Sequence, residues 1–187
     1  MKPFFFGYGS LVNRATHDYG HAHRASATGW RRAWRYTHHR QVAFLTAVPC
    51  PDSRIEGLMA EVPNGDWLAL DEREYAYDRV PASSHVDHPY EFPHEVSIYA
   101  IPDGEHHMPT DEHPILLSYL GTVIQGYLNE FGQDGVRSFF DTTSGWDAPI
   151  LDDRKEPIYP RAQRLSSAEK TLLESEMQRI DCRLIEP

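Results

Sequence analysis

The order of the predicted elements constrains this chain most: strand-like segments fill its first hundred residues, and helix-like segments follow. Residues 3–6 form a continuous apolar run that ends at a glycine, as expected of a buried central strand. Residues 29–48 predict two more strands, and residues 55–62 and 96–101 predict one each. This order favours an α+β fold with a mixed or closed sheet over a doubly wound α/β fold, in which strands and helices alternate.

Helices are predicted mainly in the later part of the chain. Residues 111–131 carry early acidic residues, apolar residues at helical spacing and a stop at Gly132, and a second helix is expected over roughly 133–141. Residues 166–169 (SSAE) have the capping-box pattern that begins a last helix. Only a short helix over residues 67–74 interrupts the predicted strands, which supports the α+β assignment.

Length, charge and cysteine content narrow the class of protein. The chain has 187 residues without a repeat or a linker, so we expect one domain over residues 1–187. A formal net charge of -10 argues against a general nucleic-acid or anionic-membrane binder. Cys50 and Cys182 make no disulfide framework, and no apolar run suits a signal peptide or a membrane span. We therefore expect a cytoplasmic protein.

The GYGS turn at residues 7–10 is the first candidate for a binding site. A dinucleotide fingerprint would need its third glycine where Val12 stands, and the Gly-Lys-Ser/Thr of a phosphate loop is absent. Both nucleotide interpretations are therefore rejected. Gly7 and Gly9 free the backbone to expose N–H groups, and Ser10 can donate or accept a hydrogen bond. The alternative is a simple turn at the end of a strand.

Eleven histidines raise the question of a metal site. No HExxH pattern occurs, and the neighbouring histidines lie among prolines and loop residues rather than on a helix that would fix both rings. The sequence therefore favours exposed, histidine-rich loops, and we predict no metal site.

The stretch GWRRAWRYTHHR, residues 29–40, carries four arginines and no acidic residue. Its aromatic interleaving is typical of a stacking platform for single-stranded nucleic acid. In an acidic protein such arginines more often pair with the chain's own carboxylates, and binding of a small anionic ligand is a further use for one of them. The four residues are Arg31, Arg32, Arg35 and Arg40.

Glu74 lies at the predicted C-terminal end of the short helix. A carboxylate there faces the negative end of the helix dipole, and partial burial acts in the same direction, so both raise its pKa toward that of a working base. The alternative is that Glu72 and Glu74 are both solvated surface charges.

Together these motifs resemble the γ-glutamylcyclotransferase-like family, whose members share YGSL or YGSN and, later, a single glutamate in a context like LDxxEG. The resemblance covers roughly the first hundred residues, and residues 142–187 remain a C-terminal extension whose role it leaves open. Trp146, Tyr159 and Arg161 of that extension are candidates to wall a cavity. The residues that match are Tyr8, Gly9, Ser10, Leu11, Leu70, Asp71 and Glu74.

One departure from the family pattern is Tyr75, which stands where a glycine is often found. A glycine there would end the helix with a positive φ, a conformation that tyrosine adopts poorly. The departure keeps a second hypothesis open, in which the chain is a non-catalytic binder of a γ-glutamyl or other small anionic ligand.

The resemblance implies a small mixed β-barrel flanked by helices, with a C-terminal helix. It also implies an enzyme that cyclises a γ-glutamyl group to 5-oxoproline and releases an amine or amino acid. Glu74 would then be the catalytic base and acid, and the substrate's own amine would be the nucleophile, so neither a metal nor a cofactor is expected. The implied substrate-binding residues are Gly7, Tyr8, Gly9, Ser10, Leu11 and Tyr77.

The leaving group is not fixed by these motifs. A free amino acid, the Cys-Gly part of glutathione and a lysine-derived amine all fit the same reaction, because members of one fold family differ in substrate. The expected partner is thus a small γ-glutamyl compound, with glutathione metabolism as one setting, and the oligomeric state is left open.

Overall fold

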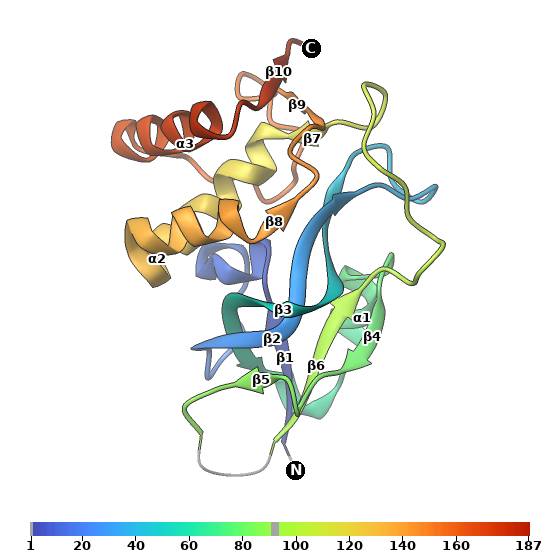
Figure 1. Cartoon of the computed structure of the whole chain (residues 1–187). Coiled ribbons are helices and arrows are strands. Elements are labelled where there is room, and N and C mark those ends of the chain that lie inside the picture. The colour runs from blue at the N-terminus through green and yellow to red at the C-terminus, as the bar shows by residue number, and fades with distance from the viewer. Residues whose placement is uncertain (1, 91–93) are drawn as a thin grey trace.

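The computed structural model describes residues 2–90 and 94–187. A curled, half-barrel sheet dominates it and runs in the order β4-β6-β1-β3-β2-β5, with β8 paired to β2 (Figure 1). Strand β1 is parallel to β6 and antiparallel to β3, so the sheet is mixed. The strands are β1 (Pro3–Gly7), β2 (His23–Arg35), β3 (Phe44–Glu61), β4 (Asp78–Pro81), β5 (Val86–Asp87), β6 (Glu95–Ala100) and β8 (Thr143–Ser144).

The phenylalanine run forms β1, as predicted, and lies between two packed faces. Phe4 and Phe6 contribute to the main core, whereas Phe5 points to the other face and packs with Leu70 and Tyr99. Because successive side chains of a strand alternate between faces, a strand covered on both sides reads as an unbroken apolar run. β1 therefore ends rigidly at Gly7, where the GYGS turn begins.

The prediction of two strands within residues 29–48 is confirmed, because β2 and the start of β3 lie there, although β2 begins earlier. The prediction of a further, separate strand over residues 55–62 is wrong, since β3 runs unbroken from Phe44 to Glu61. β3 contains Pro49 and Pro51, and a proline cannot donate a backbone hydrogen bond to a neighbouring strand. The register of the two strands shifts between Thr28 and Trp30, and residues 50–53 of β3 have no partner in β2 there. Because Pro51 lies in that irregular stretch, it removes no ladder hydrogen bond.

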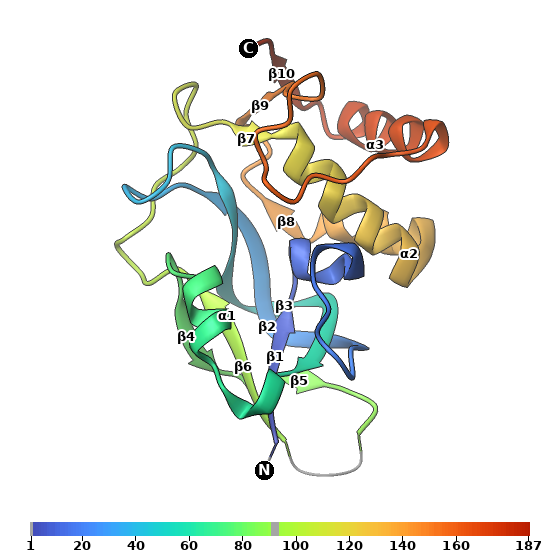
Figure 2. The same ribbon diagram turned by 180° about the vertical axis from the view of Figure 1, so that it is seen from behind.

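Three helices flank the sheet: α1 (Leu68–Arg73), α2 (Leu117–Asp141) and α3 (Ser167–Arg179). Helices α2 and α3 lie side by side on one side of the curled sheet, and α1 lies on the opposite side next to β4 (Figures 1 and 2). The α3 helix begins with the predicted capping box, because Ser166 and Glu169 exchange side-chain and backbone hydrogen bonds. This arrangement confirms the α+β class with a C-terminal helix.

Helix α2 begins six residues later than predicted, because Ile115 and Leu116 form the short strand β7 (Ile115–Leu116). The expected stop at Gly132 is present as a backbone with φ 71°, and a helical segment resumes directly after it. Close packing against the turn region explains Gly126, since a Cβ there would lie 2.6 Å from the backbone nitrogen of Asn13. None of the helices in the described residues is long and apolar enough to cross a membrane.

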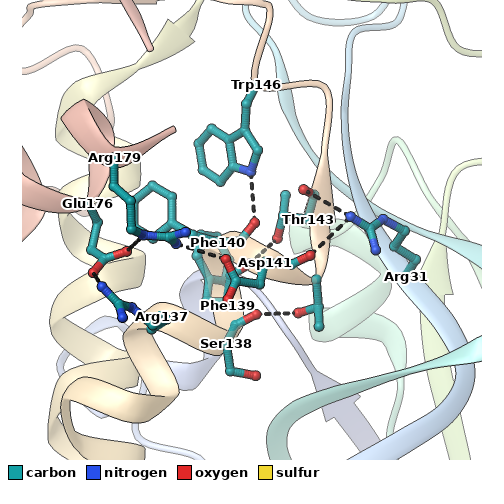
Figure 3. Close-up of polar contacts among 11 residues, drawn as sticks. Arg31, Arg137, Ser138, Phe139, Phe140, Asp141, Thr143, Trp146, Glu176 and Arg179 are labelled. Carbon is teal, nitrogen blue, oxygen red and sulfur yellow. Dashed lines mark hydrogen bonds and ion pairs between the residues drawn. The ribbon is translucent and has the colours of Figure 1, made fainter. Parts of the chain in front are cut away.

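The C-terminal extension is joined to the rest of the molecule at several places. Strands β7, β9 (Pro149–Leu151) and β10 (Arg183–Ile185) form a second, parallel sheet. Figure 3 shows Glu176 of α3 between Arg137 of α2 and Arg179, and Arg31 of β2 donating to the carbonyl oxygens of Asp141 and Thr143. These contacts hold α3 and the end of α2 against the sheet.

Candidate active site

The GYGS turn leads from β1 into the short 3₁₀ helix η1 (Ser10–Val12). The first hydrogen bond of that helix is donated by the Val12 N–H to the Gly9 carbonyl oxygen at 3.0 Å. The N–H groups of Ser10 and Leu11 precede this bond, so the turn itself gives them no acceptor. The turn therefore presents backbone donors, as its glycines suggested.

Arg32 supports the GYGS turn through hydrogen bonds from inside the core. Its side chain is fully buried and donates to the carbonyl oxygens of Tyr8 at 3.1 Å and Glu56 at 2.6 Å. The guanidinium also donates to the hydroxyl groups of Tyr127, at 2.6 Å, and Thr142, at 2.7 Å. The expectation that the arginines of residues 29–40 pair with carboxylates is thus wrong for Arg32, which binds carbonyls and hydroxyls because it lies inside the core. A residue at this depth cannot contribute to a nucleic-acid platform.

The side chain of Tyr8 is a wall of the site. Its hydroxyl donates to the Tyr99 carbonyl oxygen at 2.5 Å and accepts from the Ala47 N–H at 3.0 Å, and the ring is buried. Burial, together with the nearby Glu74 carboxylate, raises the pKa of Tyr8 well above its usual value. The hydroxyl thus stays protonated and engaged with the backbone.

Glu74 lies at the C-terminal end of α1, where its N–H donates to the Leu70 carbonyl oxygen at 2.9 Å. The carboxylate side chain is only 16% exposed, and its Oε1 lies 3.2 Å from the Arg73 Nε. Burial raises the pKa of Glu74, while the positive charges of Arg73, Arg40 and Arg161 oppose that rise. The structure thus excludes the alternative of a solvated surface charge.

The helix ends without the glycine that the family pattern led us to expect. Glu74 has φ -101° and ψ 30°, and Tyr75 is not among the described residues with a positive φ. Tyrosine therefore fits this position without backbone strain. Its ring is 62% exposed and lies over the guanidinium of Arg40, 4.9 Å from the ring centre.

Glu74 and the turn line the same small cavity, of about 40 Å³, which we call the tyrosine cavity. All the residues assigned to the site from the sequence line it, although they come from β1, the turn and the segment after α1: Gly7, Tyr8, Gly9, Ser10, Leu11, Glu74 and Tyr77. Tyr77 does not bond to Glu74, because its hydroxyl donates to the Leu45 carbonyl oxygen at 2.6 Å. The tertiary structure brings together segments that lie far apart in the sequence.

Two further tyrosines line this cavity without having been predicted. Tyr99 comes from β6 and donates its hydroxyl to Asp71, and Tyr119 comes from α2. A Cβ added to Gly9 would lie 2.8 Å from the Tyr119 hydroxyl oxygen, so this glycine makes room for the hydroxyl. Tyr119 lies within an ordinary amphipathic helix pattern, and no sequence signal separates it from a core residue.

A second cavity of about 100 Å³ adjoins the first, and we call it the arginine cavity. Ser10, Glu74, Tyr77 and Tyr119 line both cavities, so the two share a boundary at Glu74. The arginine cavity differs from the tyrosine cavity in its charged and aromatic lining. These residues come from the loop after β2, the end of α1 and the C-terminal extension: Arg40, Arg73, Tyr159 and Arg161. Trp146 does not line it and packs instead on Phe140, with ring centres 4.7 Å apart.

Neither a larger cavity nor the histidines offer a competing site. The larger cavity, of about 670 Å³, lies beside α2 and α3, but it includes neither Glu74 nor the GYGS turn. Within residues 2–90 and 94–187, no group of three or more His, Cys, Asp or Glu is placed to hold a metal ion. The shielded Glu74 carboxylate, in the same cavity as the backbone N–H groups of the turn, is thus the best candidate for an active site in the described chain.

Comparison with solved structures identifies proteins of the same fold. The chain superimposes on a solved γ-glutamyl cyclotransferase with a TM-score of 0.56 and 13% identity, covering 94% of this chain and 99% of that one. It also matches an uncharacterized protein from Homo sapiens (TM-score 0.56, 13% identity, 91% and 97% covered). A third match is YkqA from Bacillus subtilis (TM-score 0.55, 16% identity, 77% and 56% covered). These likenesses establish the fold.

The family is established by sequence. No curated protein matches the chain significantly. A family model does match, over residues 5–133, a range that contains the GYGS turn, Glu74, the whole lining of the tyrosine cavity and the lining of the arginine cavity except Tyr159 and Arg161. The chain therefore belongs to the γ-glutamyl cyclotransferase, AIG2-like family.

Proposed function

We propose that this protein cyclises the γ-glutamyl group of a small γ-glutamyl amide or peptide to 5-oxoproline and releases the attached amine or amino acid. The observation that carries the proposal is the placement of Glu74, a shielded carboxylate that lines the same cavity as the residues of the GYGS turn. Membership of the family supports the general activity.

The reaction needs one base and one set of hydrogen-bond donors. Glu74 takes a proton from the substrate's α-ammonium, and the freed amine attacks the γ-carbonyl carbon. The bond from nitrogen to the γ-carbon forms, the attacking nitrogen then gives up a second proton, and the amide bond to the leaving group breaks. Glu74 passes both protons to the leaving nitrogen, so the products are 5-oxoproline, with one hydrogen on its ring nitrogen, and the amine in its ammonium form. The nucleophile belongs to the substrate, so the proposed step requires no cofactor.

The raised pKa of Glu74 suits this double role. A base must be ionised at the working pH, but a carboxyl group with an ordinary low pKa would hold the proton too weakly to return it. Because the base form is required, we expect kcat/KM to fall as the pH drops through the raised pKa of Glu74.

The GYGS turn supplies the second requirement. The Ser10 and Leu11 N–H groups can donate to the substrate's carboxylate or to the negative charge that develops on the γ-carbonyl oxygen. The Ser10 hydroxyl orients the substrate, and the tyrosine walls keep the chain folded toward a ring. Bringing the two reacting ends together lowers the barrier of such an intramolecular attack by several kcal/mol.

The test is an assay for 5-oxoproline with a panel of γ-glutamyl amino acids, glutathione and a γ-glutamyl amine. We expect Glu74→Gln to lower kcat/KM by about a thousandfold, within the range for loss of a general base. Glu72→Gln is the matched control, because Glu72 lies two residues before Glu74 in the chain, is exposed and lines neither cavity. A Glu74→Gln protein that forms 5-oxoproline at the parent rate would refute the assignment.

The binder hypothesis makes the opposite prediction in the same assay. It expects binding of γ-glutamyl ligands without turnover across the whole panel. Its main support was Tyr75, and the strain-free end of α1 removes the reason to expect a misdirected Glu74. We retain the cytoplasm as the proposed compartment, in which the free thiols of Cys50 and Cys182 would stay reduced.

A further inference from the structure

The arginine cavity has a charge that the proposed chemistry alone does not explain. Three arginines line it against one carboxylate, Glu74, although the chain as a whole carries a net charge of -10. Arg73 lies within 3.2 Å of that carboxylate. In the described part of the chain, neither Arg40 nor Arg161 has a carboxylate within ion-pair distance. Two positive charges are thus left for a ligand.

Arg40 is held in place by rings rather than by an acid. Its guanidinium carbon lies 4.4 Å from the ring centre of Phe44, 4.9 Å from that of Tyr75 and 5.8 Å from that of Tyr77. Cation–π contacts of this kind fix a guanidinium while leaving its in-plane N–H groups free. The Nε of Arg40 is buried and has no hydrogen-bond partner among the described residues. A buried donor without an acceptor is costly, and a bound anion would satisfy it.

The position of this cavity indicates which part of the substrate meets the arginines. The γ-glutamyl group occupies the tyrosine cavity in the proposed reaction, and Glu74 at the shared boundary must reach both the α-amine and the leaving nitrogen. The leaving group therefore extends into the arginine cavity.

We propose that the arginine cavity is a leaving-group subsite for a dicarboxylate, so that the preferred substrate is a γ-glutamyl compound of an acidic amino acid. Arg40 and Arg161 bind the two carboxylates, and Tyr75 positions Arg40. The inference rests on the proposed function. The proposal also gives a role to Tyr75, which departs from the family pattern. A glycine at this position would remove one of the three aromatic rings around Arg40.

The experiment compares γ-glutamyl-glutamate with γ-glutamyl-glutamine, which differ only by one carboxylate replaced with a neutral amide. We expect kcat/KM to favour the acidic compound by about tenfold or more, as one charge-assisted hydrogen bond would provide. γ-Glutamyl-lysine, whose free side chain is cationic, should be the poorest of the three substrates.

Two variants test the residues. Arg40→Met and Arg161→Met keep an unbranched side chain and remove its charge. The variant of the arginine that binds the side-chain carboxylate should bring the preference close to unity, and the variant of the arginine that binds the α-carboxylate should lower kcat/KM for both compounds equally. Arg161 is exposed, so its variant is expected to fold normally. Arg54→Met is the matched control, because Arg54 is an exposed arginine of β3 that pairs with Asp87 and lines neither cavity. An equal preference in the parent, or a preference that survives both variants, would overturn the subsite.

Tyr75 has its own signature as a positioning residue. Tyr75→Gly should raise KM for γ-glutamyl-glutamate about threefold, in the range of one exposed cation–π contact, with little change in kcat. Tyr75→Phe keeps the ring and should retain the parent KM. Equal KM values for the glycine variant and the parent would show that Tyr75 does not position Arg40.

Failure of the subsite and failure of the proposed function give different results. Turnover of both compounds at equal efficiency contradicts only the subsite. If neither compound is turned over, the proposed function fails, and dissociation constants of the two compounds with the parent, Arg40→Met and Arg161→Met proteins decide the subsite. A preference for the acidic ligand that one of the two variants removes would still support it, and equal constants in the parent, or a preference that survives both variants, would reject it.

Discussion

The two cavities that meet at Glu74 are built in different ways. The tyrosine cavity is walled by β1, the GYGS turn and four tyrosines, two of whose hydroxyl groups are bonded to the backbone. The arginine cavity has a buried floor at Phe44 of β3 and Leu116 of β7, but its charged groups come from a loop, the end of α1 and the C-terminal extension. Core elements thus hold the part of the site that would perform the common reaction, whereas the charges that would select the leaving group come from connecting segments outside the core.

The largest effect should come from removing the support behind the tyrosine cavity. Arg32→Met deletes four hydrogen bonds of a buried guanidinium, so we expect the free energy of unfolding to fall by about 3 kcal/mol. Urea unfolding measures it. Arg31→Met is the control, since the neighbouring Arg31 is only half-buried and bonds to two carbonyl oxygens at 3.1 and 3.4 Å. Equal losses for both variants would show that the buried network has no special importance.

A smaller effect is expected from filling the space at Gly9. An alanine Cβ there would meet the Tyr119 hydroxyl at 2.8 Å and displace either the turn or the ring. We expect kcat/KM to fall by about tenfold to a hundredfold, as for a displacement of an ångström in a site that orients its substrate. Gly9 lines only the tyrosine cavity, so displacement of the turn should lower kcat/KM equally for acidic and neutral substrates.

The double variant Gly9→Ala, Tyr119→Phe tests the cause. It removes the hydroxyl that the new methyl group meets, so it should recover part of the lost activity relative to Gly9→Ala. A double variant as poor as the product of the two single losses would place the damage elsewhere in the turn.

The smallest effect concerns the boundary between the cavities. Arg73 lowers the pKa of Glu74 against the larger effect of burial, so Arg73→Met should raise that pKa further. Because the ionised carboxylate is the base, the acidic limb of the kcat/KM profile should move to higher pH. The pH profile of Arg54→Met should match that of the parent, and an unmoved limb in Arg73→Met would show that Arg73 does not tune the base.

Local patterns were sufficient to predict several parts of the molecule. The run Phe4–Phe6 indicated a strand buried on both faces, and the SSAE pattern indicated the start of α3, because each signal acts within a few residues. The two strands of the β2–β3 hairpin were predicted within residues 29–48, but the continuity of β3 through residues 55–61 was not, because only the folded ladder shows that β3 continues past its irregular stretch. The start of α2 was missed because pairing of β7 with β9 overrides the local helical pattern.

The sequence by itself determined the two chemical elements of the candidate site, the GYGS turn and a glutamate at a helix end. Their motifs are short and local, and membership of the family agrees with them. Only the tertiary structure decided what surrounds them. Arg32 lies in the core and hydrogen-bonds to the GYGS turn, and Tyr119 and Arg161 line the cavities beside Glu74. These contacts join segments that are distant in the sequence, so only the folded chain shows them. Burial and the charge of such neighbours then set the pKa of Glu74, and neither can be read from its position in the chain.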